Sequence, residues 1–316
     1  MPSSRKVILI DPAHPYLVEH LLQLGYEVED HHNTPLDELL PQLGAYFGMI
    51  IRSRFTLDED FLNRCASLKF IARMGIGLEH IDVQYAKGKG ILVLNSPEGS
   101  RDTVAEQTMG FILGLLNHIQ RSNLQVRNGQ WIRDGNKSYE LRHRTVGIIG
   151  YGNIGSAVAQ RLSSFGCRVI AYDKFKTNFG GVLAEEVSLE TVFQEADVVT
   201  LHIPYEDYNH YFVNRPFLES FRKPIFLINT SRGLVLETTA LAEALQSGKL
   251  LGAALDVIEY EEQSFYKLEV DNLPAPFQYL RQSENVIITP HTAGLSHEVM
   301  GAHARVLVEK IKAAFH

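Results

Sequence analysis

Several residues that could support hydride transfer follow apolar runs in the second half of the chain. Arg232 follows one such run and His291 follows another. The carboxylates Asp256 and Glu261 come after a third run, Leu250–Leu255. A guanidinium can hold a carboxylate through two parallel hydrogen bonds and polarise the carbonyl beside it, and an imidazole titrates near neutrality and can exchange a hydroxyl proton. A nearby carboxylate favours the imidazolium and orients the ring. Together these residue types predict oxidation of a 2-hydroxy acid or reduction of a 2-keto acid.

Each of these residues also has a simpler explanation when it is taken alone. The chain has 13 histidines, and any one of them is more often a surface or structural residue, as His202 at the end of another run could be. Arg232 could be a surface cation, and Glu261 could be one charge in the solvated run Glu259–Glu262. The joint placement favours function, because ligands bind beyond the carboxyl ends of the strands in a doubly wound sheet.

The strongest single motif is a glycine-rich turn. The apolar run Val146–Ile149 leads directly into Gly150-Tyr151-Gly152-Asn153-Ile154-Gly155, and a helical pattern follows. Gly150 permits a tight turn, Gly152 lets the backbone approach a pyrophosphate, and Gly155 allows close helix packing. Free N–H groups at the start of the helix would bind the anion. The stretch therefore predicts a dinucleotide-binding strand–turn–helix unit.

Asp173 ends the next apolar run, at the place where the motif needs an acidic residue. Its carboxylate could accept hydrogen bonds from an adenosine ribose and would repel a 2′-phosphate. This favours NAD over NADP, although Lys174 and Lys176 weaken the preference.

Composition limits the class of protein. A length of 316 residues with 45% hydrophobic content is enough for two domains, and a formal net charge of −7 argues against nucleic acid binding. Cys65 and Cys167 are far apart without metal-site spacing, so we expect neither a disulfide framework nor a metal site. No leader peptide or membrane span is recognisable. We therefore expect a cytoplasmic protein.

Strand-like and helical patterns alternate through most of the chain, which predicts an α/β fold with parallel sheets covered by helices. The expected strands are Val7–Ile10, Tyr26–Glu29, Met49–Ile51, Phe70–Ala72, Ile91–Leu94, Val146–Ile149, Val169–Tyr172, Val198–Ile203, Ile225–Asn229, Leu250–Val257 and Val286–Thr289. A helix capped by Ser100 should link two domains, and a final helix over Val299–Ile311 should return to the first. Asp271–Glu284, with two prolines, reads as a surface loop.

The whole chain resembles the D-isomer-specific 2-hydroxyacid dehydrogenases. The segments that carry the resemblance occur in the family's order and are Arg73–Asp82, Asn95–Glu106, the glycine motif, Leu227–Gly233, Gly252–Val257 and Thr289–Gly294. One departure follows Glu261, where the family commonly has proline and this chain has Glu262 and Gln263.

The resemblance implies roles for individual residues. Arg232 would hold the substrate, His291 would be the acid and base, and Glu261 would be its partner. The implied cofactor contacts are Gly150, Gly152, Asn153, Ile154, Gly155, Asp173, Pro204, Thr230, Ser231, Asp256 and Gly294. The implied substrate contacts are the backbone of Gly75, Ile76 and Gly77, which would receive the carboxylate.

The resemblance further implies two doubly wound parallel-sheet domains. Residues 1–98 plus 292–316 would form a discontinuous, flavodoxin-like substrate-binding domain, and residues 99–291 an NAD-binding Rossmann domain. The active site is expected in the cleft between them, and homodimers are expected to form through the nucleotide domain.

Four arginines bear on which acid is used. Arg52 and Arg54 resemble the phosphate-gripping segment of D-3-phosphoglycerate dehydrogenases, Arg73 matches another arginine of those enzymes, and Arg133 resembles a residue that reaches in from a dimer partner. Arginines suit a dianionic phosphate, although Arg52 and Arg54 could also be ordinary charges at a strand end. The expected reaction is NAD-dependent oxidation of 3-phospho-D-glycerate to 3-phosphohydroxypyruvate, the entry step of serine synthesis.

Two other functions stay open. The chain could be a D-lactate or glyoxylate/hydroxypyruvate reductase, which has no need of Arg52 and Arg54. It could also be an NAD-sensing binding protein similar to transcriptional corepressors on this fold. The presence of Arg232, Glu261 and His291 favours catalysis.

Overall fold

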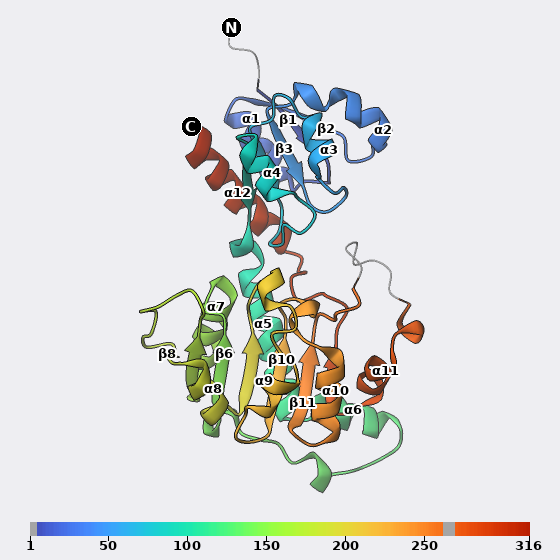
Figure 1. Cartoon of the computed structure of the whole chain (residues 1–316), viewed down its shortest axis with the longest axis vertical. Helices are drawn as coiled ribbons and strands as arrows, with labels where there is room; N and C mark the ends of the chain where they lie inside the picture. Colours follow the sequence, from blue (N-terminus) through green and yellow to red (C-terminus); the bar gives the residue numbers. More distant parts are fainter. Residues whose placement is uncertain (1–4, 262–268) are drawn as a thin grey trace. The chain divides into compact units, whose positions relative to one another are not determined.

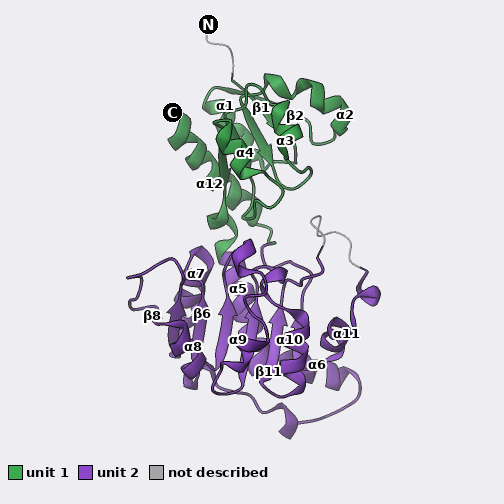
Figure 2. Cartoon of the chain, in the orientation of Figure 1, with its two compact units in different colours: residues 1–101, 295–316 green, residues 102–294 purple. Residues whose placement is uncertain are grey.

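Two compact units make up the chain (Figure 2). The computed structural model describes residues 5–261 and 269–316. Unit 1 comprises residues 1–101 and 295–316, and unit 2 comprises residues 102–294. Each unit has its own parallel sheet with helices packed on it (Figure 1), which confirms the predicted fold class.

Unit 1 is built on a five-stranded sheet in the order β2-β1-β3-β4-β5. Its strands are β1 (Arg5–Leu9), β2 (Tyr26–Asp30), β3 (Gly48–Ile51), β4 (Phe70–Arg73) and β5 (Leu92–Asn95). Its helices are α1 (Pro15–Gln23), α2 (Leu36–Leu39), α3 (Glu59–Asn63), α4 (Val83–Gly88) and α12 (Val299–Phe315). This strand order is that of flavodoxin-like folds, whose ligands bind where the order reverses, here between β1 and β3.

Unit 2 is built on a seven-stranded sheet in the order β12-β11-β10-β9-β6-β7-β8. Its strands are β6 (Thr145–Ile149), β7 (Arg168–Tyr172), β8 (Glu185–Glu186), β9 (Val198–Leu201), β10 (Ile225–Asn229), β11 (Leu250–Leu255) and β12 (Val286–Ile288). Its helices are α6 (Ile119–Arg127), α7 (Asn153–Leu162), α8 (Leu189–Glu195), α9 (Arg215–Glu219), α10 (Thr238–Gln246) and α11 (Ala275–Gln282). The order reverses between β6 and β9, the dinucleotide position in Rossmann folds.

The strands read as continuous apolar runs because both faces of each sheet are buried. In β10, Ile225 and Leu227 belong to one core cluster, whereas Phe226 and Ile228 belong to the cluster on the opposite face. Successive side chains of a strand alternate between faces, so one strand serves two cores.

Helix α12 completes unit 1, as the sequence predicts for the final helix. Its side chains Ala304, Leu307, Val308 and Ile311 belong to the same buried cluster as residues of the first strand, such as Val7. In Figure 1 this helix, drawn in red, lies beside α1 in unit 1.

The helix that links the two units, α5 (Pro97–Leu116), begins earlier than predicted. Ser100 lies inside the helix and is not its N-cap, because Pro97 already occupies the first helical position, where a missing N–H costs nothing. The helix ends before His118, whose φ of 51° breaks the pattern ahead of α6.

The prediction that Asp271–Glu284 is a surface loop is wrong for most of its length. Helix α11 occupies Ala275–Gln282, with Pro274 as its N-cap and Pro276 in its first turn. Both prolines sit where a helix tolerates them, and the helix buries Phe277 and Leu280 in the core.

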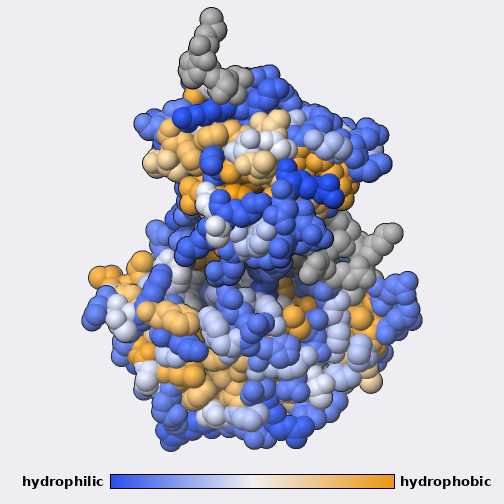
Figure 3. All heavy atoms as spheres, turned by 45° about the horizontal axis from the view of Figure 1, so that its top comes forward, coloured by the Kyte–Doolittle hydropathy of each residue, from blue (hydrophilic) through white to orange (hydrophobic). Residues whose placement is uncertain are grey.

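The surface of both units is largely hydrophilic, with hydrophobic residues interspersed, on the face drawn in Figure 3. Across the described part of the chain, no helix combines the length and the apolar character that a membrane crossing requires. The same residues contain no group of three or more His, Cys, Asp or Glu side chains that could hold a metal ion.

Candidate active site and dinucleotide site

Three neighbouring strands of unit 2 bring the predicted catalytic residues to one edge of the sheet. Strands β10, β11 and β12 are parallel and adjacent, and Leu255 is paired with both Asn229 and Ile288. The loops that carry Arg232 and His291 therefore begin at the same level of the sheet.

Glu261 and His291 are in direct contact. Glu261 Oε2 lies 2.5 Å from His291 Nδ1, and the two side chains are 17% and 26% exposed. The other carboxylate oxygen, Oε1, accepts the backbone N–H of Ile258 at 2.5 Å. The carboxylate therefore fixes the imidazole ring through Nδ1. Glu262 and Gln263, the departure from the family pattern, lie outside the described residues.

Asp256 shapes the turn that presents His291. Its Oδ1 accepts the Thr289 hydroxyl at 2.5 Å and the Thr292 N–H at 2.9 Å, and its Oδ2 accepts the Ala293 N–H at 2.8 Å. The carboxylate is 1% exposed, and His291 adopts a left-handed φ of 53° within this turn. The residue that the resemblance assigns to the cofactor thus also holds the turn that carries His291.

The segment that carries Arg232 is held by the strand that precedes it. Asn229 donates from Nδ2 to Arg232 O at 3.0 Å and accepts from the N–H and hydroxyl of Ser231 at 3.0 and 2.7 Å. Gly233 allows this segment to touch the next one, because a Cβ there would lie 1.9 Å from Ile258 O. Arg232 is thereby fixed beside the segment that leads to Glu261.

The three glycines of the glycine turn differ in what surrounds them. Gly150 has φ +94°, and a Cβ there would lie 2.5 Å from His202 O; a Cβ on Gly155 would lie 2.1 Å from Gly150 O. A Cβ on Gly152, in contrast, would meet nothing within 4 Å. Gly152 is also the N-cap of α7 and supplies no side chain to its first turn. Two glycines are thus required by protein packing, whereas the third leaves open space at a helix N-terminus, which fits an anionic group.

Asp173, at the end of β7, is bound to the same turn. Oδ2 accepts the Tyr151 N–H at 2.8 Å, and Oδ1 accepts the N–H groups of Phe175 and Lys176 at 2.9 and 3.0 Å. Burial opposes ionisation of this carboxyl, but the three backbone donors outweigh it and lower its pKa. The charge that would discriminate against a 2′-phosphate is thus stabilised by the protein itself.

The remaining predicted cofactor residues follow other strands of the same sheet or begin α7. Pro204 comes after β9 and accepts Asn209 Nδ2 at 2.6 Å. Thr230, 6% exposed, lies 3.1 Å from Thr108 of α5 through their hydroxyl oxygens. The others are Asn153 and Ile154 in the first turn of α7, Ser231 after β10, and Gly294 at the end of unit 2.

The predicted carboxylate-binding loop, Gly75–Gly77, lies after β4 in unit 1. Gly75 has φ +150°, and a Cβ there would lie 1.3 Å from Arg73 Nη1, so only glycine fits. Gly75 N donates to Ser96 Oγ at 3.0 Å, and Ser96 N donates to Gly75 O at 2.9 Å. Asn95 Nδ2 donates to Ile76 O at 2.7 Å. The loop is therefore held by the residues that end β5.

The arginines proposed for a phosphate differ in their surroundings. Arg54 donates to three backbone carbonyls, those of Ile10, His31 and Thr34, at 3.3, 2.9 and 2.7 Å. Its guanidinium is thus committed to the protein. The backbone N–H of Arg52 donates to Asp11 at 2.6 Å, and no hydrogen bond or ion pair of its guanidinium is recorded with any described residue.

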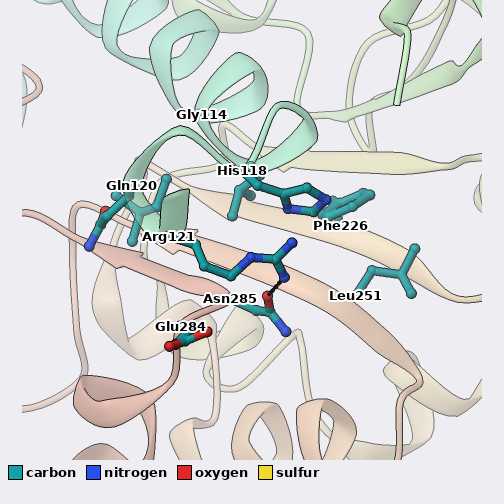
Figure 4. A pocket seen from close by; sticks show the side chains of 10 residues that line it. Gly114, His118, Gln120, Arg121, Phe226, Leu251, Glu284 and Asn285 are labelled. Atoms are coloured by element: carbon teal, nitrogen blue, oxygen red, sulfur yellow. Dashed lines mark hydrogen bonds between the residues drawn. The ribbon is translucent and has the colours of Figure 1, made fainter. Parts of the chain in front are cut away.

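Arg133, predicted to reach a dimer partner, is exposed in the segment after α6. Arg121 anchors this segment, donating to Asn136 Oδ1 at 2.9 Å and to Gly135 O at 2.5 Å. It also donates to Asn285 Oδ1 at 2.9 Å, the dashed contact in the small pocket shown in Figure 4.

Sequence reasoning missed residues that support the loops of unit 1. Asp11, which binds the backbone after β3, and Ser96, which binds Gly75, were not singled out. Both follow predicted strands, so the strand-end argument used for unit 2 could have found them.

Comparison with known proteins identifies the family. Residues 109–293 match the D-isomer specific 2-hydroxyacid dehydrogenase, NAD binding domain. A hydroxypyruvate reductase of Thermotoga maritima is 37% identical over 90% of each chain. A D-3-phosphoglycerate dehydrogenase of Methanocaldococcus jannaschii is 33% identical over 97% of this chain and 57% of its own. The crystal structure of D-lactate dehydrogenase from Aquifex aeolicus, complexed with NAD and lactic acid, superposes with TM-score 0.79 at 31% identity, covering 98% of this chain and 95% of that chain.

The chain belongs to the D-isomer-specific 2-hydroxyacid dehydrogenases, as its residues predict. Its cofactor is NAD, and it is an NAD-dependent oxidoreductase of this family. It spans 90% of the hydroxypyruvate reductase but little more than half of the phosphoglycerate dehydrogenase.

Proposed function

We propose that the protein interconverts a D-2-hydroxy acid and its 2-keto acid through Arg232, Glu261 and His291. The observation that carries this proposal is the 2.5 Å contact between Glu261 and His291, made at the strand edge that also carries Arg232. An imidazole oriented by a carboxylate and a guanidinium carried at the same sheet edge are the groups that this reaction requires.

In the direction of oxidation, His291 accepts the hydroxyl proton at Nε2 as the C2–H bond breaks. Glu261 stabilises the resulting imidazolium through Nδ1. Arg232 holds the substrate carboxylate and stabilises the oxygen that becomes the carbonyl. NAD, when bound, supplies the hydride acceptor. By resemblance, the Gly75–Gly77 loop also binds the substrate carboxylate, through the N–H groups of Ile76 and Gly77, because the Gly75 N–H donates to Ser96 Oγ and Arg73 O.

The substrate that we place first is 3-phospho-D-glycerate, because unit 1 offers positive charge at neighbouring strand ends. Arg73 is paired with Ile51 in the sheet, so Arg52 follows directly beside it. Guanidinium groups at adjacent strand ends favour a bound anion.

Hydroxypyruvate, with D-glycerate as its product, is the second candidate. The observation that favours it is the commitment of Arg54 to the carbonyls of Ile10, His31 and Thr34. A phosphate site that loses one of its expected arginines binds a dianion less strongly. The similar protein of Thermotoga maritima bears the name hydroxypyruvate reductase.

Steady-state rates decide between the two candidates. Purified protein is assayed with NAD and 3-phosphoglycerate, and with NADH and hydroxypyruvate, by the absorbance of the reduced cofactor. Arg52→Ala should raise KM for the phosphorylated substrate at least tenfold, on the order of the 1.5–3 kcal/mol of a charged hydrogen bond, and leave KM for hydroxypyruvate unchanged. Turnover of neither acid, nor of glyoxylate or pyruvate, would refute the proposed activity.

We further propose a homodimer formed through unit 2. Trp131, Ile132, Val126, Leu124 and Ile119 are large hydrophobic residues with 80%, 46%, 50%, 48% and 56% of their surface exposed. Apolar side chains concentrated on one exposed segment are typical of an interaction site, and Arg133 lies within it. Sedimentation of Trp131→Ser at micromolar concentration should show monomers where the wild type shows dimers.

A corepressor-like binding role makes an opposite prediction about His291. If the protein acts by sensing NAD, a cellular phenotype of its deletion is rescued by His291→Ala; if it acts by catalysis, rescue fails. A cytoplasmic location stays a prediction, which fractionation of cells would test.

A further inference from the structure

A buried histidine near the C-terminus touches the support of the Gly75–Gly77 loop. His303, in α12, is 5% exposed, and Ser96, between β5 and α5, is fully buried. His303 Nδ1 lies 2.8 Å from Ser96 Oγ and 2.9 Å from Ser96 O. In one tautomer Nδ1 accepts a hydrogen bond from the Ser96 hydroxyl. In the other, Nδ1–H donates to the Ser96 carbonyl. Either tautomer therefore binds the ring to Ser96.

Ser96 in turn anchors Gly75, whose N–H also donates to Arg73 O at 2.9 Å. The Gly75 N–H donates to Ser96 Oγ at 3.0 Å, while the Ser96 N–H donates to Gly75 O at 2.9 Å. The hydroxyl could instead turn towards Arg73 O at 3.3 Å. The contact with His303 on the other side of the hydroxyl therefore decides whether the Ser96 hydroxyl points towards His303 or towards Arg73 O.

The local packing brings α12 close enough for this contact. A Cβ on Gly99 would lie 2.3 Å from His303 Nδ1 and 2.8 Å from its backbone nitrogen, so the first turn of α5 and α12 touch through a glycine. Two turns further along the same face of α12, Lys310 donates to Asn95 O at 3.0 Å and pairs with Glu98 at 2.9 Å. Both side chains hold the segment 95–99.

We infer that His303 is a positioning residue, which fixes Ser96 and through it the backbone of Gly75, where the Gly75–Gly77 loop begins. The inference rests on the proposed function, because that function assigns the Gly75–Gly77 loop to the substrate carboxylate. His303 itself contacts neither substrate nor cofactor in this role. Its effect should therefore appear in substrate binding and not in the chemical step.

Burial, together with the positive charges of Arg73 and Arg52, lowers the pKa of His303 to about 4. The ring is accordingly neutral near pH 7, so both tautomers described above are available. Asparagine, whose side chain is a neutral amide, can replace histidine in the contact with Ser96, because its Oδ1 takes a place close to that of the histidine Nδ1.

The test compares His303→Leu, which keeps apolar volume without a hydrogen-bonding atom, with His303→Asn. His303→Leu should raise KM for the 2-keto acid about tenfold, as expected when one buried hydrogen bond is lost, with kcat and NAD affinity nearly unchanged. His303→Asn should bring KM most of the way back to the wild-type value. Amide hydrogen exchange at residues 73–77 should quicken in His303→Leu and return towards wild type in His303→Asn.

Several results would overturn the inference. One is a folded His303→Leu protein with wild-type KM and wild-type exchange at residues 73–77; another is an equal fall in kcat, NAD affinity and substrate affinity, which indicates general destabilisation. If His303→Leu does not fold, Ser96→Ala takes its place and must show the same selective rise in KM. If the wild type turns over no 2-hydroxy or 2-keto acid, the proposed function fails, and the exchange measurement alone decides the role of His303.

Discussion

Each unit has a loop that follows a parallel strand and lies next to an arginine in the sequence. The two loops are held in place in different ways. The loop after β10 carries Arg232 and is held by Asn229, three residues earlier in the chain. The loop after β4 follows Arg73 and is held by Ser96, 21 positions along the chain, which contacts His303 a further 207 positions away.

This difference shows which contacts hold the loop in each unit. In unit 2, the loop that carries Arg232 contains its own support, because Asn229 lies three residues before Arg232 in the same short motif. In unit 1, the support is tertiary, and it depends on the packing of a helix from the other end of the sequence. Variants of the two loops should therefore fail differently, with loss of turnover in one and loss of substrate affinity in the other.

The largest effect should come from His291→Ala in unit 2. Loss of a general acid–base catalyst should lower kcat about 10²- to 10⁴-fold, while NAD affinity, measured by fluorescence titration, stays near that of the wild type. His143→Ala is the matched control, because His143 lies in unit 2 with a side chain 66% exposed. If the His291→Ala enzyme kept the wild-type kcat, the expectation that variants of unit 2 lose turnover would be wrong.

A pair of glycine variants separates local packing from ligand binding in unit 2. Gly155→Ala places a Cβ 2.1 Å from Gly150 O, so it should lower the free energy of unfolding by about 1–3 kcal/mol or more. Gly152→Ala meets nothing within 4 Å and should leave stability unchanged while weakening NAD binding about tenfold. Denaturant unfolding and NAD titration of both proteins check this, and equal losses of stability would contradict it.

A pair of arginine variants makes the same separation in unit 1. Arg54→Ala removes the arginine donor from three backbone carbonyls, of which His31 O keeps the Thr34 N–H, and should cost about 1–3 kcal/mol of unfolding free energy. Arg52→Ala should leave stability unchanged, because its guanidinium has no recorded partner among the described residues. Thermal unfolding of the two variants measures the difference. A destabilised Arg52→Ala would show that Arg52, too, is structural.

The smallest effect concerns acid stability. Because the pKa of His303 falls from 6.5 in the unfolded chain to about 4 in the folded protein, the unfolded chain binds the proton more readily. Stability is therefore lost as pH falls from 6.5 towards 4, by about 1 kcal/mol between pH 7 and pH 5.5. His303→Asn should lack this contribution, so its unfolding free energy should fall less over the same interval. Parallel urea titrations at the two pH values would detect the difference, and identical slopes would exclude it.

More of the candidate site could be predicted from the sequence in unit 2 than in unit 1, and one physical reason explains both outcomes. Strand ends that lie side by side in a parallel sheet can be inferred from the order of apolar runs, and the contact of Glu261 with His291 follows that logic. The role of Arg54 could not be inferred, because its acceptors lie in three other segments of unit 1. The proline pair Pro274 and Pro276 misled the prediction, since proline both breaks and begins helices.

The return of α12 to unit 1 has a consequence for synthesis on the ribosome. The side chains Leu307, Val308 and Ile311, which complete the core under the sheet of unit 1, follow unit 2 in the chain and are translated after it. Unit 2 is continuous and can reach its native packing while residues 5–101 still lack this part of their core. Residues 5–101 should therefore become resistant to protease later than unit 2, although they are translated before it.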